Sequence, residues 1–206
     1  MGKNNYMVAQ LLEVGGLTSA LTGMMLSYNN AGDMSSVVKL WVTLSCPGTP
    51  EYTKAIEIAN RLASHNNGEN KFLRFIPVSV VVRAPRYWWQ EFDTYKVGAE
   101  RLSQSTMHTC TKRYFTQDDF CEFIPEHYMQ DLNHARDQQD WLKVKRLLPE
   151  SFLQIRVVCM NLASLQNMYR QRKEHRLPEW SKFFTDIFTG LPPVMQEWVT
   201  GVDNAE

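Results

Sequence analysis

The chain has 206 residues, of which 44% are hydrophobic and 21% are charged, and 22 lysines and arginines balance 22 aspartates and glutamates. This length and apolar content predict a single folded domain over residues 1–206 with a full hydrophobic core. The net charge of zero excludes the broad positive field that recruits nucleic acid or an acidic membrane, so neither is an expected partner. Any anion site must therefore be built locally from a few arginines.

Cysteine and histidine spacing gives no sign of a metal site. The four cysteines lack a CxxC pair, and the five histidines are scattered along the chain. The first residues lack the apolar run of a signal peptide, and no apolar run is long enough to span a bilayer. We therefore expect a cytoplasmic protein with free thiols.

The first 96 residues mix predicted strands and helices. Strands are predicted at 6–14 and 72–82, and helices at 17–28, 50–65 (stopped by residues 66–68) and 86–96. Thr49 and Pro50 are typical of a helix start, and the segment 37–44 fits a helix or a strand. Pro77 lies inside the second strand, and a proline there indicates an edge strand or a bulge.

The rest of the chain is predicted to be a loop followed by helices. The polar, Ser/Thr-rich segment 97–116 is expected to be a structured, irregular loop of a kind that is often functional. The predicted helices are 118–129 (broken by Pro125), 131–148, 151–172 (one long or two short), 178–189 and 193–199. The fold class is therefore α+β, with helices packed on a small sheet.

The sequence contains no GxGxxG, P-loop, HExxH or GxSxG motif, but one basic segment is unusual. Residues 143–149 lead into Asn161, Asn167, Arg170 and Arg172. Side-chain amides offer the donor and acceptor that the edge of a uracil or flavin ring requires, and arginines grip phosphate. An amphipathic helix with a solvated polar face explains the same residues.

A second segment combines a strand end, aromatic residues and hydroxyl groups. Residues 83–89 (RAPRYWW) are followed by Ser103, Ser105, Thr106 and Thr109. Hydroxyls and backbone amides of such a loop can frame an anion site. The aromatic residues are equally typical of a core or an interface.

Together these segments resemble the flavin-dependent thymidylate synthase (ThyX) family. Residues 144–149 (VKRLLP) and 161–172 (NLASLQNMYRQR) resemble the family pattern A-R-x-x-L-P followed by N-A-R-S-L-x-N-F-L-x-L-R, without a gap. Residues 174–180 lie where the family has D-x-H-A-Q-W-E. Residues 53–65 and 78–85 resemble the family's helix ending in Gly-His and the strand before its substrate helix. The resemblance spans nearly the whole chain.

The resemblance implies an α+β fold with a small, mostly antiparallel sheet. It implies dUMP as substrate, FAD as cofactor, and NADPH and methylenetetrahydrofolate as cosubstrates. The implied reaction transfers a one-carbon unit to C5 of the uracil ring without a cysteine nucleophile. The implied assembly is a homotetramer with active sites between subunits.

The resemblance also implies substrate-binding residues. Arg172 matches an arginine that holds the uracil ring and polarises it for attack at C5, and Arg146 matches one that binds the nucleotide phosphate. Ser103 sits where a family serine contacts the phosphate, and Ser105 follows it in the same hydroxyl-rich loop.

For the flavin, the resemblance is partial. Asn161 and Asn167 match residues that border the flavin ring, and His65 matches a histidine near it. The family's Arg-His-Arg signature is missing: residues 92–98 read FDTYKVG, in which Lys96 keeps at most one charge. A flavin dinucleotide has a pyrophosphate with about two negative charges that cations or a helix N-terminus must meet. The sequence therefore supports nucleotide binding more than the usual redox cycle.

Three hypotheses remain open at this point. The first is a flavin-dependent thymidylate synthase-like enzyme, or a dUMP hydroxymethylase that uses the same residues. The second is a non-redox descendant that binds a pyrimidine nucleotide as a sensor or structural subunit. The third is an unrelated interaction protein. Bound flavin separates the first from the second, and a nucleotide-induced thermal shift separates both from the third.

Overall fold

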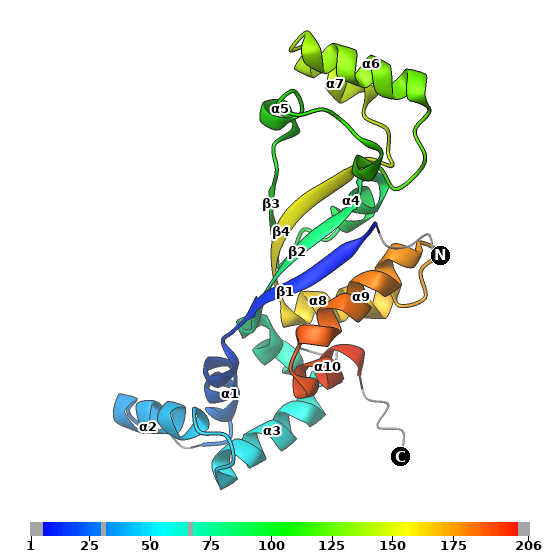
Figure 1. The fold of residues 1–206 in the computed structure, drawn as a ribbon. Coiled ribbons are helices and arrows are strands. Elements are labelled where there is room, and N and C mark those ends of the chain that lie inside the picture. The colour runs from blue at the N-terminus through cyan, green and yellow to red at the C-terminus, as the bar shows by residue number, and fades with distance from the viewer. Residues whose placement is uncertain (1–5, 30–31, 66–67, 202–206) are drawn as a thin grey trace.

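The computed structural model describes residues 6–29, 32–65 and 68–201 (Figure 1). The strands are β1 (Val8–Val14), β2 (Pro77–Pro85), β3 (Ala99–Ser103) and β4 (Leu153–Asn161). The α-helices are α1 (Leu17–Met25), α2 (Met34–Leu44), α3 (Pro50–Ala63), α4 (Arg86–Phe92), α5 (Thr106–Thr109), α6 (Glu126–Asp137), α7 (Trp141–Leu147), α8 (Leu162–Arg172), α9 (Pro178–Gly190) and α10 (Pro193–Thr200). Two 3-10 helices are η1 (Glu69–Phe75) and η2 (Gln117–Asp119).

The four strands form one antiparallel sheet in the order β1-β2-β4-β3. The predicted α+β class with a small antiparallel sheet is therefore confirmed. Helices α1–α3 gather at one end of the molecule and α5–α7 at the other, with the sheet between them (Figure 1).

One face of the sheet is covered by helices. Val78, Val80 and Val82 alternate along β2 and are fully buried against a core that includes Trp88 of α4 and Trp180 of α9. The ring centroids of Trp88 and Trp180 lie 4.9 Å apart. Aromatic pairs at this separation add to the area that they bury, so α4 and α9 are fixed against the sheet and each other.

The other face of the sheet is uncovered in the part of the chain described. Its exposed apolar residues come from three strands: Val8, Leu12, Leu102, Ile155 and Val157. By register, the exposed residues Gln10, Glu13 and Glu100 lie on the same face. The register aligns Val157 with Val81 on one side and with Leu102 on the other. Val81, Val157 and Leu102 therefore form an apolar row across β2, β4 and β3, and Gln10 of β1 lies at the end of this row.

A second, smaller hydrophobic cluster holds α6 and α7 to the end of the sheet. It contains Leu132, Val144 and Phe152, which are all buried. Gln139 has a φ of 53°, and Asp140 accepts a hydrogen bond from the backbone of Lys143 at the start of α7. This left-handed turn and the new N-cap end α6 and start α7, which replace the single helix predicted at 131–148.

Three predictions about the sheet are wrong. Residues 153–161 form the strand β4 and not part of a helix, because Ile155, Val157 and Val158 are β-branched and favour the pleated surface. Pro77 does not mark an edge strand or a bulge in its own strand: β2 is central, Pro77 is its first residue, where a missing N–H is tolerated, and the irregularity in the β1–β2 pairing lies on β1 between Leu11 and Glu13. The segment predicted as an irregular loop contains β3 and α5.

The ambiguous segment at 37–44 belongs to helix α2, which Asp33 caps through the backbone N–H of Ser36. Predicted strand residues 72–75 lie instead in the 3-10 helix η1. Within the described ranges, no helix has the length and apolar character to cross a bilayer, and no group of three His, Cys, Asp or Glu residues is arranged to hold a metal ion.

Candidate functional site

The start of α8 is fixed against the loop before β3. Asn161 is the N-cap residue, and its side-chain oxygen accepts a hydrogen bond from the backbone of Ser164 at 2.9 Å. The backbone N–H of Asn161 donates to the carbonyl of Gly98, and the hydroxyl of Ser164 donates to that of Val97, both at 3.1 Å. These bonds bring residues 97–98 next to the first turn of α8.

The last turn of α8 carries Arg172, which sits in a pocket of aromatic rings and polar partners. Its Nε donates to the hydroxyl of Tyr95 at 2.9 Å, and its Nη2 lies 3.0 Å from a carboxylate oxygen of Glu91. The guanidinium carbon is 5.5 Å from the ring centroid of Trp180. The Arg172 side chain is 18% exposed, so the group is largely sheltered and still open to a ligand.

A hydrogen-bond chain runs from Arg172 along α8. The Tyr95 hydroxyl donates to the side-chain oxygen of Gln171 at 3.0 Å, and the amide nitrogen of Gln171 donates to the side-chain oxygen of Asn167 at 3.0 Å. Donors and acceptors agree along the chain, because a tyrosine hydroxyl donates once and also accepts. Arg172 and Asn167 are thus parts of one network.

A buried carboxylate fixes the start of α9, next to this network. Glu179 is 4% exposed and accepts hydrogen bonds from the hydroxyls of Tyr6 and Tyr87. Burial, followed by the hydrogen bond to Glu179, raises the pKa of Tyr6 to about 12, and the same causes raise the pKa of Tyr87. Because Trp180 follows Glu179, this cluster also holds the ring that lies over Arg172.

Segment 92–98 is engaged in ion pairs within the chain. The carboxylate of Asp93 binds Arg156 at 3.0 and 3.1 Å and Arg101 at 3.0 Å. The Arg156 guanidinium also lies 4.3 Å from the ring centroid of Trp89. One carboxylate therefore faces two cations, which leaves this cluster with a net positive charge.

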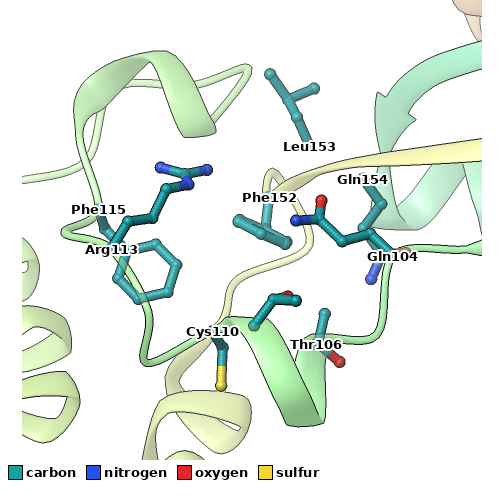
Figure 2. A pocket seen from close by; sticks show the side chains of 9 residues that line it. Gln104, Thr106, Cys110, Arg113, Phe115, Phe152, Leu153 and Gln154 are labelled. Carbon is teal, nitrogen blue, oxygen red and sulfur yellow. The ribbon is translucent and has the colours of Figure 1, made fainter.

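A small pocket opens between β3, α5 and the start of β4 (Figure 2). Its cavity is about 30 Å³, and its polar lining comes from Gln104, Thr106, Thr109, Arg113 and Gln154. Cys110 also lines the pocket, and burial raises the pKa of its thiol. The pocket has room for a water-sized group.

Arg113 at this pocket is already paired. It contacts both carboxylate oxygens of Asp119, one of them at 2.8 Å. Burial works against the ionised form of Asp119, but the hydrogen bonds from Arg113 and from the backbone of Thr116 outweigh it and hold the Asp119 pKa below its usual value. The pair stabilises the loop and leaves Arg113 with reduced capacity for another anion.

Solved structures share this architecture. ThyX from Helicobacter pylori, complexed with FAD and dUMP, aligns with a TM-score of 0.70 and 15% identity over 93% of this chain and 97% of that chain. A second structure of the same enzyme with FAD and dUMP aligns with a TM-score of 0.69 and 16% identity over 95% of this chain and 100% of that chain. The chain has the ThyX fold.

A UMP/dUMP methylase, PolB from Streptomyces cacaoi bound with 5-Br dUMP, aligns less closely. Its TM-score is 0.64 and its identity 12%, over 94% of each chain. No protein-family model and no curated protein matches the sequence. At these identities the likeness shows the ThyX fold alone.

The ThyX fold does not gather all the predicted site residues within one chain. Asn167 and Arg172 share a network, and Asn161 lies at the other end of the same helix. Arg146 is exposed on α7 and His65 follows α3, and these helices lie at opposite ends of the molecule (Figure 1). His65 contacts Glu69.

The remaining predicted residues lie on the surface between these ends. Ser103 ends β3, and Ser105 follows it; both are exposed, and neither lines the pocket of Figure 2. Of the hydroxyl residues predicted to frame an anion site, Thr106 and Thr109 line this pocket, and Ser103 and Ser105 do not. Lys96 is exposed just before Val97 and Gly98.

Sequence reasoning missed Glu91 and Tyr95 as partners of Arg172. The two residues are four apart, on one face of the helix predicted at 86–96, and that spacing was the available signal. The helix α4 ends at Phe92, so Tyr95 reaches Arg172 from the turn that follows.

Proposed function

We propose that the protein binds dUMP and modifies C5 of its uracil ring, as a flavin-dependent thymidylate synthase-like enzyme. The observation that carries this proposal is the setting of Arg172. Tyr95 and Glu91 engage two of its nitrogens, which leaves about three of the five N–H groups of a guanidinium for a ligand. A uracil carbonyl is an acceptor that these groups fit.

The chemical role of Arg172 follows from this setting. Addition of a nucleophile at C6, which activates C5 toward an electrophilic one-carbon unit, would move the electrons of the C5–C6 double bond onto a uracil carbonyl oxygen, and a fixed guanidinium stabilises that charge. The largely sheltered position of Arg172 beside Trp180 lowers the local dielectric constant, which strengthens the interaction. Arg146, in this proposal, binds the nucleotide phosphate, with Ser103 and Ser105 as further phosphate contacts.

The residues present fit the ring of a flavin better than its pyrophosphate. The exposed amide of Asn167 and the half-buried amide of Asn161 offer polar edges for a ring, with His65 nearby in the assembled site. Lys96 is an exposed cation for the pyrophosphate, whereas Arg101 and Arg156 are held by Asp93. A bound FAD would supply hydride chemistry, with NADPH as reductant and methylenetetrahydrofolate as carbon donor.

The ion pairs that Asp93 makes within the chain favour a second candidate function. This candidate is a non-redox protein that binds a pyrimidine nucleotide as a sensor or structural subunit. Asp93 introduces a carboxylate where the ThyX signature has cations, and its ion pairs with Arg101 and Arg156 make these two cations less available to a pyrophosphate. This candidate keeps the nucleotide site at Arg172 and omits the flavin.

The wide separation of Arg146 and His65 supports a site completed by other copies of the chain. We infer a homotetramer in which one copy supplies Arg172 and others supply Arg146 and His65. The uncovered face of the sheet supports self-association, because it exposes apolar residues on three strands and large exposed apolar patches often mark interfaces.

The visible absorbance of the purified protein, before and after addition of FAD and with dUMP titrated in, tests the proposal. A bound flavin whose spectrum shifts with dUMP supports the enzyme, and product analysis then separates methyl from hydroxymethyl transfer. Binding of dUMP without flavin supports the non-redox candidate. Absence of binding to dUMP and UMP contradicts both.

Two substitutions test the nucleotide site. Arg146→Ala and Arg172→Ala are each expected to weaken dUMP binding at least about tenfold, because each removes a charge-assisted hydrogen bond. Isothermal titration measures the affinity. Lys143→Ala and Lys173→Ala are matched controls, since they remove an exposed cation in or next to the same two helices and are expected to bind dUMP as the wild type does. Wild-type affinity in both arginine variants would remove the case for this site.

A further inference from the structure

Arg172 needs a fixed orientation to act on a flat ring. An arginine side chain carries about 2 kcal/mol of rotamer entropy, so an unheld guanidinium samples many directions. Here Tyr95 binds Nε and Glu91 binds Nη2. Contacts at two nitrogens of a planar group fix both its place and the tilt of its plane.

The two partners of Arg172 are held in place by different contacts. Tyr95 packs its ring edge-on against Trp180, with centroids 5.9 Å apart, and its hydroxyl donates to Gln171. Glu91 lies on α4, whose neighbours Trp88 and Phe92 are buried in the core. Tyr95 is thus braced by its ring and its hydroxyl, and Glu91 by its helix.

The same series of hydrogen bonds also fixes the orientation of the Asn167 side-chain amide. Arg172 donates to Tyr95, Tyr95 donates to Gln171, and Gln171 donates to the oxygen of Asn167. Because the Asn167 oxygen is engaged, its NH₂ group is the part left to face a ligand. One tyrosine hydroxyl therefore links the orientation of the arginine to that of the amide.

We propose that Tyr95, with Glu91, is the positioning residue for Arg172 and, through Gln171, for Asn167. This inference rests on the proposed function for its catalytic meaning, but the network can be tested without a nucleotide. Tyr95 lies within residues 92–98, where the ThyX family carries Arg-His-Arg. The chain thus has a tyrosine-centred network in a segment where the family has a basic signature.

The first test measures hydrogen exchange of the Arg172 Nε–H by NMR in protein labelled with ¹⁵N-arginine. Arg172→Lys assigns the signal. Tyr95→Phe keeps the ring and removes the hydroxyl, and it is expected to speed this exchange about tenfold. Tyr169→Phe is the matched control: Tyr169 lies on α8 and packs its ring against Phe184, and its loss of a hydroxyl is expected to leave the exchange unchanged.

The second test measures dUMP affinity and turnover of the same variants. Tyr95→Phe is expected to weaken dUMP binding about three- to tenfold and to lower kcat more than it raises KM, because a mobile guanidinium stabilises the transition state less well. Glu91→Gln keeps an acceptor for Nη2, and a smaller effect in the same direction is expected.

Unchanged exchange in Tyr95→Phe overturns the inference, whatever the nucleotide affinity does. Weaker dUMP binding with unchanged exchange would mean that the hydroxyl touches the ligand directly, which also contradicts a positioning role. Faster exchange in a protein whose wild type binds no dUMP would support the network and refute the proposed function, so the two failures are distinguishable.

Discussion

At the scale of single residues, Gly98 decides how the loop before β3 meets α8. Its φ is 70°, in the left-handed region, and a Cβ there would lie 2.6 Å from both the Asn161 side-chain nitrogen and the Ser164 hydroxyl. The glycine is required on two grounds, conformation and space. It allows the carbonyl of the loop to accept a hydrogen bond from the backbone of Asn161.

Gly98→Ala is expected to lower the free energy of unfolding by about 1–3 kcal/mol, since it strains the backbone and displaces the N-cap of α8. Urea denaturation measures the change. Gly23→Ala is the control: Gly23 lies inside α1, where an added Cβ would have no neighbour within 4 Å, and alanine there is expected to stabilise by about 0.5–1 kcal/mol. Equal effects of the two substitutions would contradict the argument.

The ionisation of Asp119 makes the free energy of unfolding depend on pH in the acidic range. Its pKa is lower in the folded protein than the usual value of 3.8, so its ionised form stabilises the fold above that value. The stabilisation is lost as the pH falls through 3.8 and then through the lowered pKa. Asp119→Asn is expected to reduce Tm by about 2–4 °C at pH 7, and the difference from wild type should shrink below about pH 4. A pH series of thermal melts measures it; a constant difference would contradict this assignment.

At the scale of elements, a buried glutamine ties α8 to two neighbours. Gln166 is 2% exposed, and its amide nitrogen donates to the carbonyls of Ala63 at 2.8 Å and Trp198 at 2.6 Å. Its oxygen accepts from Asn70 at 3.2 Å. These hydrogen bonds hold the C-terminal ends of α3 and α10 against the middle of α8.

Gln166→Met is expected to cost about 2–4 kcal/mol of folding free energy, because it fills a similar volume but leaves buried carbonyls without a donor. Gln130→Met, on the exposed surface of α6, is expected to change the stability by less than about 0.5 kcal/mol. Chemical denaturation of both variants provides the measurement. A small effect of Gln166→Met would show that water replaces the lost donor.

The sequence predicted the helices of this fold better than its sheet. The helices predicted at 50–65, 178–189 and 193–199 start at the predicted residue, because prolines and an N-cap threonine mark their starts, and they end within two residues of the predicted ends. Strand β4 was hidden because the apolar/polar alternation of residues 153–157 changes phase at Val157 and Val158, so that Ile155 and Val157 face outward whereas Val158 and Met160 face inward. The N-cap signal at Asn161 was present and marks the true start of α8.

The candidate site was predictable only where residues follow one another along α8. The spacing of Asn161, Asn167 and Arg172 on the chain carried over to the structure as one helix and its cap. The partnership of Arg172 with Tyr95 joins residues 77 positions apart, and no local pattern encodes such a contact. The roles of Arg146, His65 and the serines stay predictions, since the single chain does not test them.

At the scale of the whole molecule, the uncovered sheet face is the surface that self-association would bury. Leu102 is 79% exposed and Val157 is 37% exposed, and they are neighbours across β3 and β4. An apolar surface of this kind is usually buried in an interface.

Val157→Glu is expected to shift the proposed tetramer to smaller species, because a buried carboxylate without a partner is costly at an interface. Sedimentation velocity measures the distribution. Thr185→Glu places the same charge on the exposed side of α9, away from this face, and is expected to leave the assembly intact. A wild-type chain that sediments as a monomer would refute the proposed assembly itself.

The strand order β1-β2-β4-β3 also determines when the sheet can form during synthesis on the ribosome. Strand β3 pairs only with β4, and β4 is the last strand in the described part of the chain. Until residues 153–161 emerge, the nascent chain can pair only β1 with β2, and a two-stranded ribbon is marginally stable in water. Protein synthesis adds about 5–20 residues per second, so several seconds pass between the synthesis of β2 and that of β4. During this time one edge of β2 is unpaired and its apolar side chains are exposed to solvent. The central place of β4 makes this interval the stage at which the chain depends most on protection from aggregation.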